Sequence, residues 1–557
     1  MTYNDARAAS SKNPRKIILI QVRAFASSRH LACWRNHLQQ AATIGGVMSF
    51  QLLRIEALNF ERTVLDTDKL SVTRGGGLLL REAIVAVAAK VESLGGKGIS
   101  TGASIGEFQI ADANAQAALA AALAVLGASR YDCFTFAASL CADNERELAV
   151  AQTRFQQFQQ LTLAPDLSTN ASQACDWTKT RAAIEEVHAT ENHEKIWVGA
   201  GVKARHDFGR GEKLGQETLS GIEQFYQRET SPPEKVEKSD WVAAIRKLKF
   251  SNEFSEIATN APVPWKRLEN KLALIYLDGN KFSRFVQGKT ADQVQEFDAC
   301  LGKYRKALLG KLVQKAQADS ECKNAAPMRL EVLMWGGDES ELLVPAWCGF
   351  ALTQWLFEAM QGWSFDGHEL THAMGLVFFH HKTPVARIRN LARELAQGCK
   401  DLMTPPNSTP PKLTNAYDYL VCESIDFPAQ PLDEFWQARL RHEYAKAKRP
   451  LLPCNADLTE LQKALRQLPR SQIYAAAACL APGQRNETFD ARIKRIEEDL
   501  GLKAQIDAVT SYFRPLLGAA DTADKKKLDA LLWVHLRELY DYLVRVETSP
   551  LNSGVQS

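Results

Sequence analysis

Three features that would place a protein in a special class are missing from this sequence. No apolar run approaches the roughly 20 residues that a membrane-spanning helix needs, so we expect a cytoplasmic protein with no membrane contact. The 11 cysteines are scattered without a Cys-x-x-Cys pair, which predicts reduced, buried thiols rather than a disulfide or zinc framework. The net charge is only +3, which argues against a strongly basic nucleic-acid coat but leaves room for local basic patches.

Acidic residues are almost absent from residues 1–47, where Asp5 is the only one. This basic stretch, rich in serine and alanine, predicts a disordered extension. A transit peptide has a similar composition, and translation starting at Met48 is a third interpretation.

The rest of the chain is too long for a single hydrophobic core, since the whole has 557 residues and cores stop growing well below that length. Residues 48–163 and 271–425 show the same alternation of strand-like and helix-like segments. Residues 164–270 are more polar and irregular and predict a connector, whereas residues 426–557 have a helical pattern. We therefore expect four domains after the extension.

Hydrophobic periodicity predicts the elements of the two similar domains. In residues 48–163 we expect strands at 50–56 and 131–141, a strand-turn-strand at 99–110, helices at 78–94, 113–126 and 144–161, and a polar loop at Arg74-Gly75-Gly76-Gly77. In residues 271–425 we expect strands at 272–278, 370–379 and 417–422, a hairpin at 328–344, and helices at 290–318, 347–360 and 384–402. This order predicts an antiparallel-centred sheet with helices on one side, the ferredoxin-like arrangement. The predicted fold class is α+β, with tandem ferredoxin-like domains, a helical connector and a C-terminal helical bundle.

Two apolar runs in residues 271–425 end in acidic residues. The first ends in Asp278-Gly279-Asn280 and the second in Gly336-Gly337-Asp338-Glu339. We expect two buried strands that bring Asp278 and Asp338 to the same edge of one sheet, where a carboxylate pair can hold divalent metal ions against nucleotide phosphates. The Gly279 carbonyl is a candidate third ligand, and the glycines allow a tight turn with close approach of phosphates. A simple polar hairpin is the alternative interpretation.

A competing motif is His368-Glu369-Leu370-Thr371-His372, which matches the H-E-x-x-H signature of zinc metalloproteases. That chemistry requires both histidines on one face of a helix. Asp366-Gly367 before the motif and the apolar run 373–379 after it favour a turn and a strand instead. The zinc protease is therefore the third interpretation of function.

The acidic segments carry a family resemblance. Tyr276-Leu277-Asp278-Gly279-Asn280 together with Trp335-Gly336-Gly337-Asp338-Glu339 resembles the nucleotidyl-cyclase palm shared by GGDEF diguanylate cyclases and the large subunit of type III CRISPR effector complexes. The second family is the closer one. His381-Lys382-Thr383-Pro384 before a helix ending in Cys399-Lys400 resembles a segment of that subunit, and Thr67-Asp68-Lys69-Leu70-Ser71 with Arg74-Gly75-Gly76 resembles its first, degenerate palm. The resemblance covers residues 48–425.

This resemblance implies conversion of ATP to cyclic oligoadenylates with release of pyrophosphate, using Mg²⁺ or Mn²⁺, in an antiviral defence system. Asp278 and Asp338, with the Gly279 carbonyl, would bind the metal, and Lys400 would reach the triphosphate. The expected catalytic residues are Asp278, Asp338 and Glu339, and the expected nucleotide-binding residues are Gly279, Asn280, Ser283, Gly336, Gly337 and Lys400. The implied partners are ATP, other CRISPR effector subunits and RNA. A catalytically weak scaffold or RNA-regulated sensor is the alternative function.

Several positions depart from the family pattern. Glu339 stands where the CRISPR members usually have an aspartate, and the residues before Met48 contain no histidine-aspartate nuclease domain. His206-Asp207 is a lone dipeptide that we expect on the surface, and Cys175 is the only cysteine in the connector, so the family's zinc site is missing. In the first palm, residues 102–107 replace the acids, which predicts that this domain binds a nucleotide or merely packs, without metal.

Overall fold

The computed structural model describes most of the chain from residue 49 to residue 544. The described residues are 49–128, 130–131, 133–158, 173–179, 182–188, 195–210, 219–318, 327–403, 413–422, 428, 431–445, 458–483, 487–513 and 522–544. Residues Phe50–Ser557 form one compact unit, so the domain boundaries predicted within it stay predictions. The predicted extension, residues 1–47, lies outside the described residues. Among the helices that are described, none combines the length and the apolar character that crossing a membrane would require.

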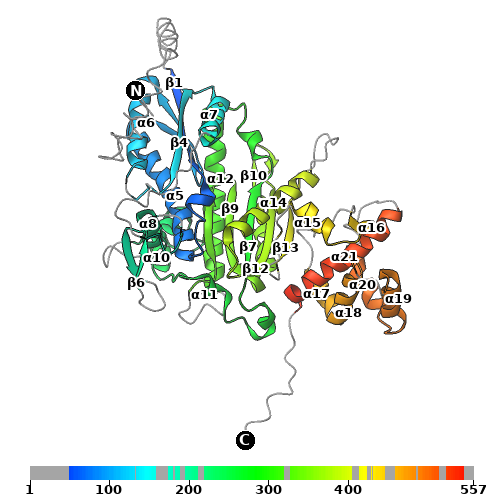
Figure 1. Ribbon diagram of the computed structural model, residues 1–557. Helices are drawn as coiled ribbons and strands as arrows, with labels where there is room; N and C mark the ends of the chain where they lie inside the picture. Colours follow the sequence, from blue (N-terminus) through cyan, green and yellow to red (C-terminus); the bar gives the residue numbers. More distant parts are fainter. Residues whose placement is uncertain are drawn as a thin grey trace, which may run out of the picture. The chain divides into compact units, whose positions relative to one another are not determined.

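The first sheet has four antiparallel strands in the order β2-β3-β1-β4. Figure 1 labels β1 and β4, which are neighbours in this sheet. Its elements are β1 (Phe50–Leu58), α4 (Phe60–Thr63), α5 (Leu70–Glu92), β2 (Lys97–Thr101), β3 (Ile105–Ala111), α6 (Asp112–Leu126), β4 (Thr135–Ala142) and α7 (Arg146–Phe158). The alternating apolar residues of β1 and β3 pack against α5 and α6 in one core. Every strand and helix predicted here is present within a few residues of its expected bounds, except that α5 begins eight residues early.

The predicted polar loop Arg74-Gly75-Gly76-Gly77 is wrong, because these residues are buried inside α5. A Cβ atom at Gly75 would lie 1.8 Å from the carbonyl oxygen of Arg205, and one at Gly77 would lie 1.9 Å from that of Leu333. The glycines therefore allow two other backbone segments to lie directly against the helix on two of its sides. This packing outweighs their poor helix propensity.

The connector has a two-stranded sheet and several short helices. Its elements are β5 (Glu185–His188), β6 (Lys195–Val198), α8 (Ala200–Arg210), α9 (Gly221–Glu229), α10 (Lys238–Ile245), α11 (Phe254–Ala258) and the 3₁₀ helix η1 (Val263–Leu268). His206 was expected on the surface, but it is buried in α8, where its ring lies 4.8 Å from that of Trp177. The expectation failed because α8 packs against α5 and turns this residue inward.

The second sheet has five strands in the order β13-β12-β7-β9-β8, in which only the β12–β13 pair is parallel. Its elements are β7 (Lys271–Gly279), η2 (Phe282–Phe285), α12 (Ala291–Ala318), β8 (Glu331–Gly336), β9 (Glu339–Pro345), η3 (Ala346–Cys348), α13 (Gly349–Ala359), β10 (Ser364–Phe365), β11 (His368–Glu369), β12 (His372–His380), α14 (Val385–Met403) and β13 (Ala416–Val421). The first four strands of this sheet along the chain, in the spatial order β8-β9-β7-β12, repeat the order β2-β3-β1-β4 of the first sheet.

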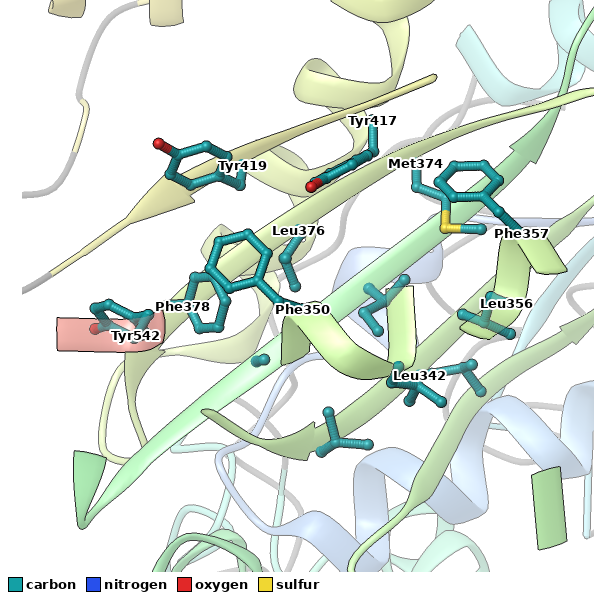
Figure 2. Packing of buried hydrophobic residues seen from close by; sticks show 14 of the residues in the cluster. Leu342, Phe350, Leu356, Phe357, Met374, Leu376, Phe378, Tyr417, Tyr419 and Tyr542 are labelled. Carbon is teal, nitrogen blue, oxygen red and sulfur yellow. The ribbon is translucent and has the colours of Figure 1, made fainter. Parts of the chain in front are cut away.

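Helices cover both faces of the second sheet, which corrects the expectation of a one-sided layer. On one face, the ring of Phe378 in β12 contacts that of Phe350 in α13 at a tilt, with centroids 4.9 Å apart, and Tyr417 packs on Phe357 (Figure 2). On the other face, α14 approaches so closely that a Cβ at Gly375 would lie 1.8 Å from the Ala392 carbonyl oxygen. A strand such as β12, apolar on both sides, requires a cover on both.

The C-terminal part is helical, as predicted. Its helices are α15 (Leu432–Ala438), α16 (His442–Ala445), α17 (Leu458–Arg466), α18 (Arg470–Ala478), α19 (Phe489–Glu498), α20 (Lys503–Phe513) and α21 (Thr522–Leu543). The last helix, α21, has a buried face that includes Leu532 and Leu539, both fully buried. This helix also contacts the second sheet, because His535 Nδ1 lies 2.7 Å from the Tyr419 hydroxyl and the Tyr542 ring packs on Phe378 (Figure 2).

Candidate functional site

The two predicted acids lie at one edge of the second sheet. β7 pairs with β9 so that Asp278 faces Glu339 across the ladder. Asp338 occupies the turn between β8 and β9, and its carbonyl oxygen accepts a hydrogen bond of 3.2 Å from the Gly279 N–H. The end of β7 and the acidic turn are therefore joined directly by the backbone.

Lys400, near the end of α14, reaches the same edge. Its Nζ lies 2.6 Å from Asp278 Oδ2 and donates a hydrogen bond of 2.9 Å to the Gly279 carbonyl oxygen. The two side chains of the pair are about one-fifth exposed, at 21% and 19%. A cationic group is thus held by two of the oxygens that the sequence predicts as metal ligands.

The site concentrates negative charge in a partly desolvated place. Burial is the main reason why the pKa of Asp278 is raised to about 6. The Lys400 ammonium opposes this rise, while the charges of Asp338 and Glu339 add to it. The pKa of Asp338 is raised as well. Although its side chain reaches solvent, the surrounding protein removes part of the hydration of the carboxylate, and the charge of Glu339 adds to the rise. Ionising both carboxyls is therefore unfavourable unless a cation is close.

Glu339 is engaged with a tyrosine and an arginine. The buried Tyr276 hydroxyl hydrogen-bonds to Glu339, and burial together with this carboxylate raises the pKa of Tyr276. Arg393 of α14 hydrogen-bonds to Tyr276 and lies above its ring, 5.8 Å from the centroid. The role of Glu339 in catalysis stays a prediction, but its place in the fold is now explained.

Lys400 belongs to a row of three cations on α14 that faces acids on the sheet. Arg389 pairs with the fully buried Glu341, Arg393 approaches Glu339 through Tyr276, and Lys400 pairs with Asp278. Sequence reasoning missed the first two members. Their signal is the spacing, since positions 389, 393 and 400 recur at four and seven residues and so share one face of a helix.

The glycine turn of the second sheet packs against the corresponding turn of the first sheet. Gly336 has φ +148°, and a Cβ there would lie 2.6 Å from the Ala103 nitrogen. Gly337 has φ +64°, and its carbonyl oxygen accepts a hydrogen bond from buried Arg305. The space beside Gly336 that was expected to admit phosphates is thus occupied by the backbone of residues 102–103. The first sheet therefore packs against this turn, and nucleotide binding by the first domain stays a prediction.

Asn280 and Ser283 lie just beyond β7 but differ in exposure. Asn280 is buried, and its Nδ2 donates hydrogen bonds of 3.0 Å to Thr371 Oγ1 and 3.1 Å to the Thr414 carbonyl. Its Oδ1 is buried without a hydrogen-bond partner among the described residues. Ser283 is exposed in η2. The nucleotide contacts predicted for both stay predictions.

The zinc-protease interpretation lacks the helix that it requires. His368 and Glu369 form the exposed strand β11, while His372 begins β12 and is buried. The ring of His372 packs between Phe282 and Trp363. The two histidines therefore stand on different strands instead of on one helical face, because the apolar run after the motif joins the sheet.

Buried His372 should make folding sensitive to acid. Burial lowers the pKa of His372 to about 3, whereas an unfolded histidine titrates near 6.5. The unfolded chain then binds the extra proton first, so the stabilisation is present above about pH 6.5 and is lost as pH falls, by about 1.4 kcal/mol per pH unit. Between pH 6.5 and 5 we expect the free energy of unfolding to fall about 2 kcal/mol less for His372→Phe than for the wild type. Equal pH dependence in denaturant titrations of both proteins would contradict this assignment.

The oxygens present at the sheet edge suit a hard divalent cation. The donor set is two carboxylates and one carbonyl, and an ammonium is already held by Asp278 and Gly279. Within the described ranges, no group of three or more histidine, cysteine or acidic side chains is arranged to hold a metal ion. Mg²⁺ keeps several waters and needs few protein oxygens when it is shared with phosphates, so a small donor set fits it.

Comparisons with known proteins give a likeness of fold. No protein-family model matches the chain, and no curated protein matches it. Among solved structures, the apo Csm1–Csm4 cassette is 11% identical with a TM-score of 0.48, covering 90% of this chain and 71% of that chain. Csm1 of T. onnurineus is 13% identical with a TM-score of 0.44 over the same shares. The Csm1–Csm4 cassette in complex with one ATP is 12% identical with a TM-score of 0.45, covering 89% and 70%. The structures to which the chain is similar thus include Csm1 and the Csm1–Csm4 subcomplex of the type III-A CRISPR-Csm interference complex.

Proposed function

We propose that this protein is a metal-dependent nucleotidyltransferase that converts ATP to oligoadenylate, cyclic or linear, with release of pyrophosphate. The observation that carries the proposal is the meeting of Asp278, Asp338 and Lys400 at one edge of the second sheet, with Lys400 Nζ 2.6 Å from Asp278 Oδ2. The two sheets, which share the order of their first four strands along the chain, would be tandem palm domains. ATP as substrate, and CRISPR effector subunits and RNA as partners, follow from the motif resemblance.

Each residue has a defined task in this proposal. Asp278, Asp338 and the Gly279 carbonyl would hold Mg²⁺ or Mn²⁺, which neutralises phosphate charge and lowers the pKa of an attacking hydroxyl. Lys400 would bind the triphosphate, for which an ammonium on a flexible stem is suited. Arg389, through its buried ion pair with Glu341, holds α14 and therefore Lys400 in place. Asn280 would orient the nucleotide through its buried amide.

The proposal is tested by incubating the purified chain with ATP and Mg²⁺ or Mn²⁺ and identifying the products by mass spectrometry. The Asp278→Ala, Asp338→Ala double variant serves as the matched control. Oligoadenylate made by the wild type alone is the expected result. If neither protein makes product, even after partner proteins and RNA are added, the proposal fails.

A catalytically weak scaffold or RNA-regulated sensor is the second candidate, and two observations favour it. The ammonium of Lys400 already neutralises Asp278. The backbone of residues 102–103 also covers Gly336, so this glycine has a packing role without any nucleotide. In this case ATP would be bound without turnover, which equilibrium binding measured beside the product assay distinguishes.

A further inference from the structure

The oxygens proposed to bind a divalent cation already hold a cation of the protein itself. Lys400 Nζ contacts Asp278 Oδ2 at 2.6 Å and the Gly279 carbonyl oxygen at 2.9 Å. These are two of the three proposed metal ligands. An ammonium in contact with the Asp278 carboxylate opposes the approach of a divalent ion to the same group, because like charges that close repel each other.

The rest of α14 is fastened to the sheet, so any exchange at this edge has to come from the lysine side chain. Arg389 is ion-paired with buried Glu341, and the backbone of Ala392 lies against Gly375 with no room for a Cβ. A lysine stem of four carbons can swing its ammonium by several ångströms while its backbone stays in place. The pair is about one-fifth exposed, so the ammonium has a path toward solvent and toward a bound phosphate.

We propose that Lys400 is a resident counterion that excludes free divalent cations from Asp278 until a nucleotide triphosphate draws its ammonium away. The site then takes the metal–nucleotide complex in preference to the free ion. This inference rests on the proposed function, since it assumes that Asp278 and Gly279 are metal ligands. It adds that the site prefers the metal–nucleotide complex to the free metal ion, which the set of ligand oxygens alone does not specify.

The consequence is a coupling between two ligands. A triphosphate that binds the ammonium frees the carboxylate, so nucleotide should tighten metal binding and metal should tighten nucleotide binding by the same factor. Removing the ammonium should tighten the binding of free metal and weaken the binding of nucleotide without metal. These changes have opposite signs, whereas a variant that merely loosens the fold would weaken both.

The test measures Mn²⁺ binding by the electron paramagnetic resonance signal of the free ion. The full chain is titrated with and without the α,β-methylene analogue of ATP, which cannot release pyrophosphate. Lys400→Met and Lys400→Gln remove the charge, and Lys400→Arg keeps it. Lys382→Met is the control for net charge, since Lys382 is exposed and follows the opposite end of β12.

We expect both neutral variants to bind free Mn²⁺ about tenfold more tightly than the wild type, which corresponds to about 1.4 kcal/mol. They should bind the analogue without metal more weakly, while Lys382→Met stays close to the wild type. Lys400→Arg, which keeps the charge, should not gain affinity for free Mn²⁺. Unchanged or weaker binding of free Mn²⁺ by folded Lys400→Met and Lys400→Gln would overturn the inference. Failure of the proposed metal site would look different, because Asp278→Asn would then bind Mn²⁺ with the analogue as tightly as the wild type.

Discussion

Replacing Asp338 with alanine is expected to abolish oligoadenylate synthesis while leaving the protein folded. The carboxylate stands in the exposed turn between β8 and β9, so its loss leaves no cavity in a core. It also removes one of the charges that raise the pKa of Asp278. Loss of a group that holds the charge-neutralising metal should reduce the rate by about a thousandfold or more, measured as product formed from ATP by mass spectrometry.

The control for this prediction is thermal stability. Because Asp338, Glu339 and Asp278 repel one another, the melting temperature of Asp338→Ala should equal that of the wild type or exceed it slightly. Asp338→Asn, which keeps the shape and removes the charge, should be as inactive as the alanine variant. Product at the wild-type rate from either variant would show that the site is assigned to the wrong residues.

The second large effect concerns Gly77 in the middle of α5. Helix propensity alone predicts that Gly77→Ala stabilises the helix by about 1 kcal/mol. In the fold, the new Cβ would lie 1.9 Å from the Leu333 carbonyl oxygen on β8. Backbone cannot yield at that distance, so we expect a loss of about 3 kcal/mol or more. For a cooperative unit of this size, a fall in melting temperature of about 3 °C or more would follow.

Gly398→Ala is the matched control on α14. This glycine also lies inside a helix, but no atom stands within 4 Å of the position of a Cβ there. The same substitution should therefore stabilise the protein by up to about 1 kcal/mol. If the melting temperatures of Gly77→Ala and Gly398→Ala shifted in the same direction, that result would contradict a tight contact between α5 and β8 at Gly77.

Local patterns in the sequence sufficed to place Asp278 and Asp338. Each follows an apolar run that forms a buried strand, β7 or β8. The two strands were expected to be neighbours, but β9 lies between them in the sheet. The helix at α14 was equally readable, since Pro384 marks its start and its apolar residues recur at three and four. Lys400 was selected only through the family resemblance, because a lysine at a helix end has many ordinary uses.

Contacts between distant segments could not be read in the same way. The glycines of α5 look like a loop because propensity is a local quantity, and only the backbones of α8 and β8 reveal why they are helical. The packing of Gly336 on Ala103 depends equally on how the two sheets meet. Neither contact leaves a periodic signal along the chain.

The α+β fold class, most helices and strands of both sheets and the sheet edge that carries the acids could be predicted from the sequence, because hydrophobic periodicity and strand ends are local properties. The surroundings of those acids could not, because they depend on tertiary packing. The Lys400 ammonium on Asp278, the Tyr276–Glu339–Arg393 contacts and the turn held by Arg305 join residues far apart in the chain. Such contacts arise from the packing of α12 and α14 on opposite faces of one sheet, which no single segment encodes.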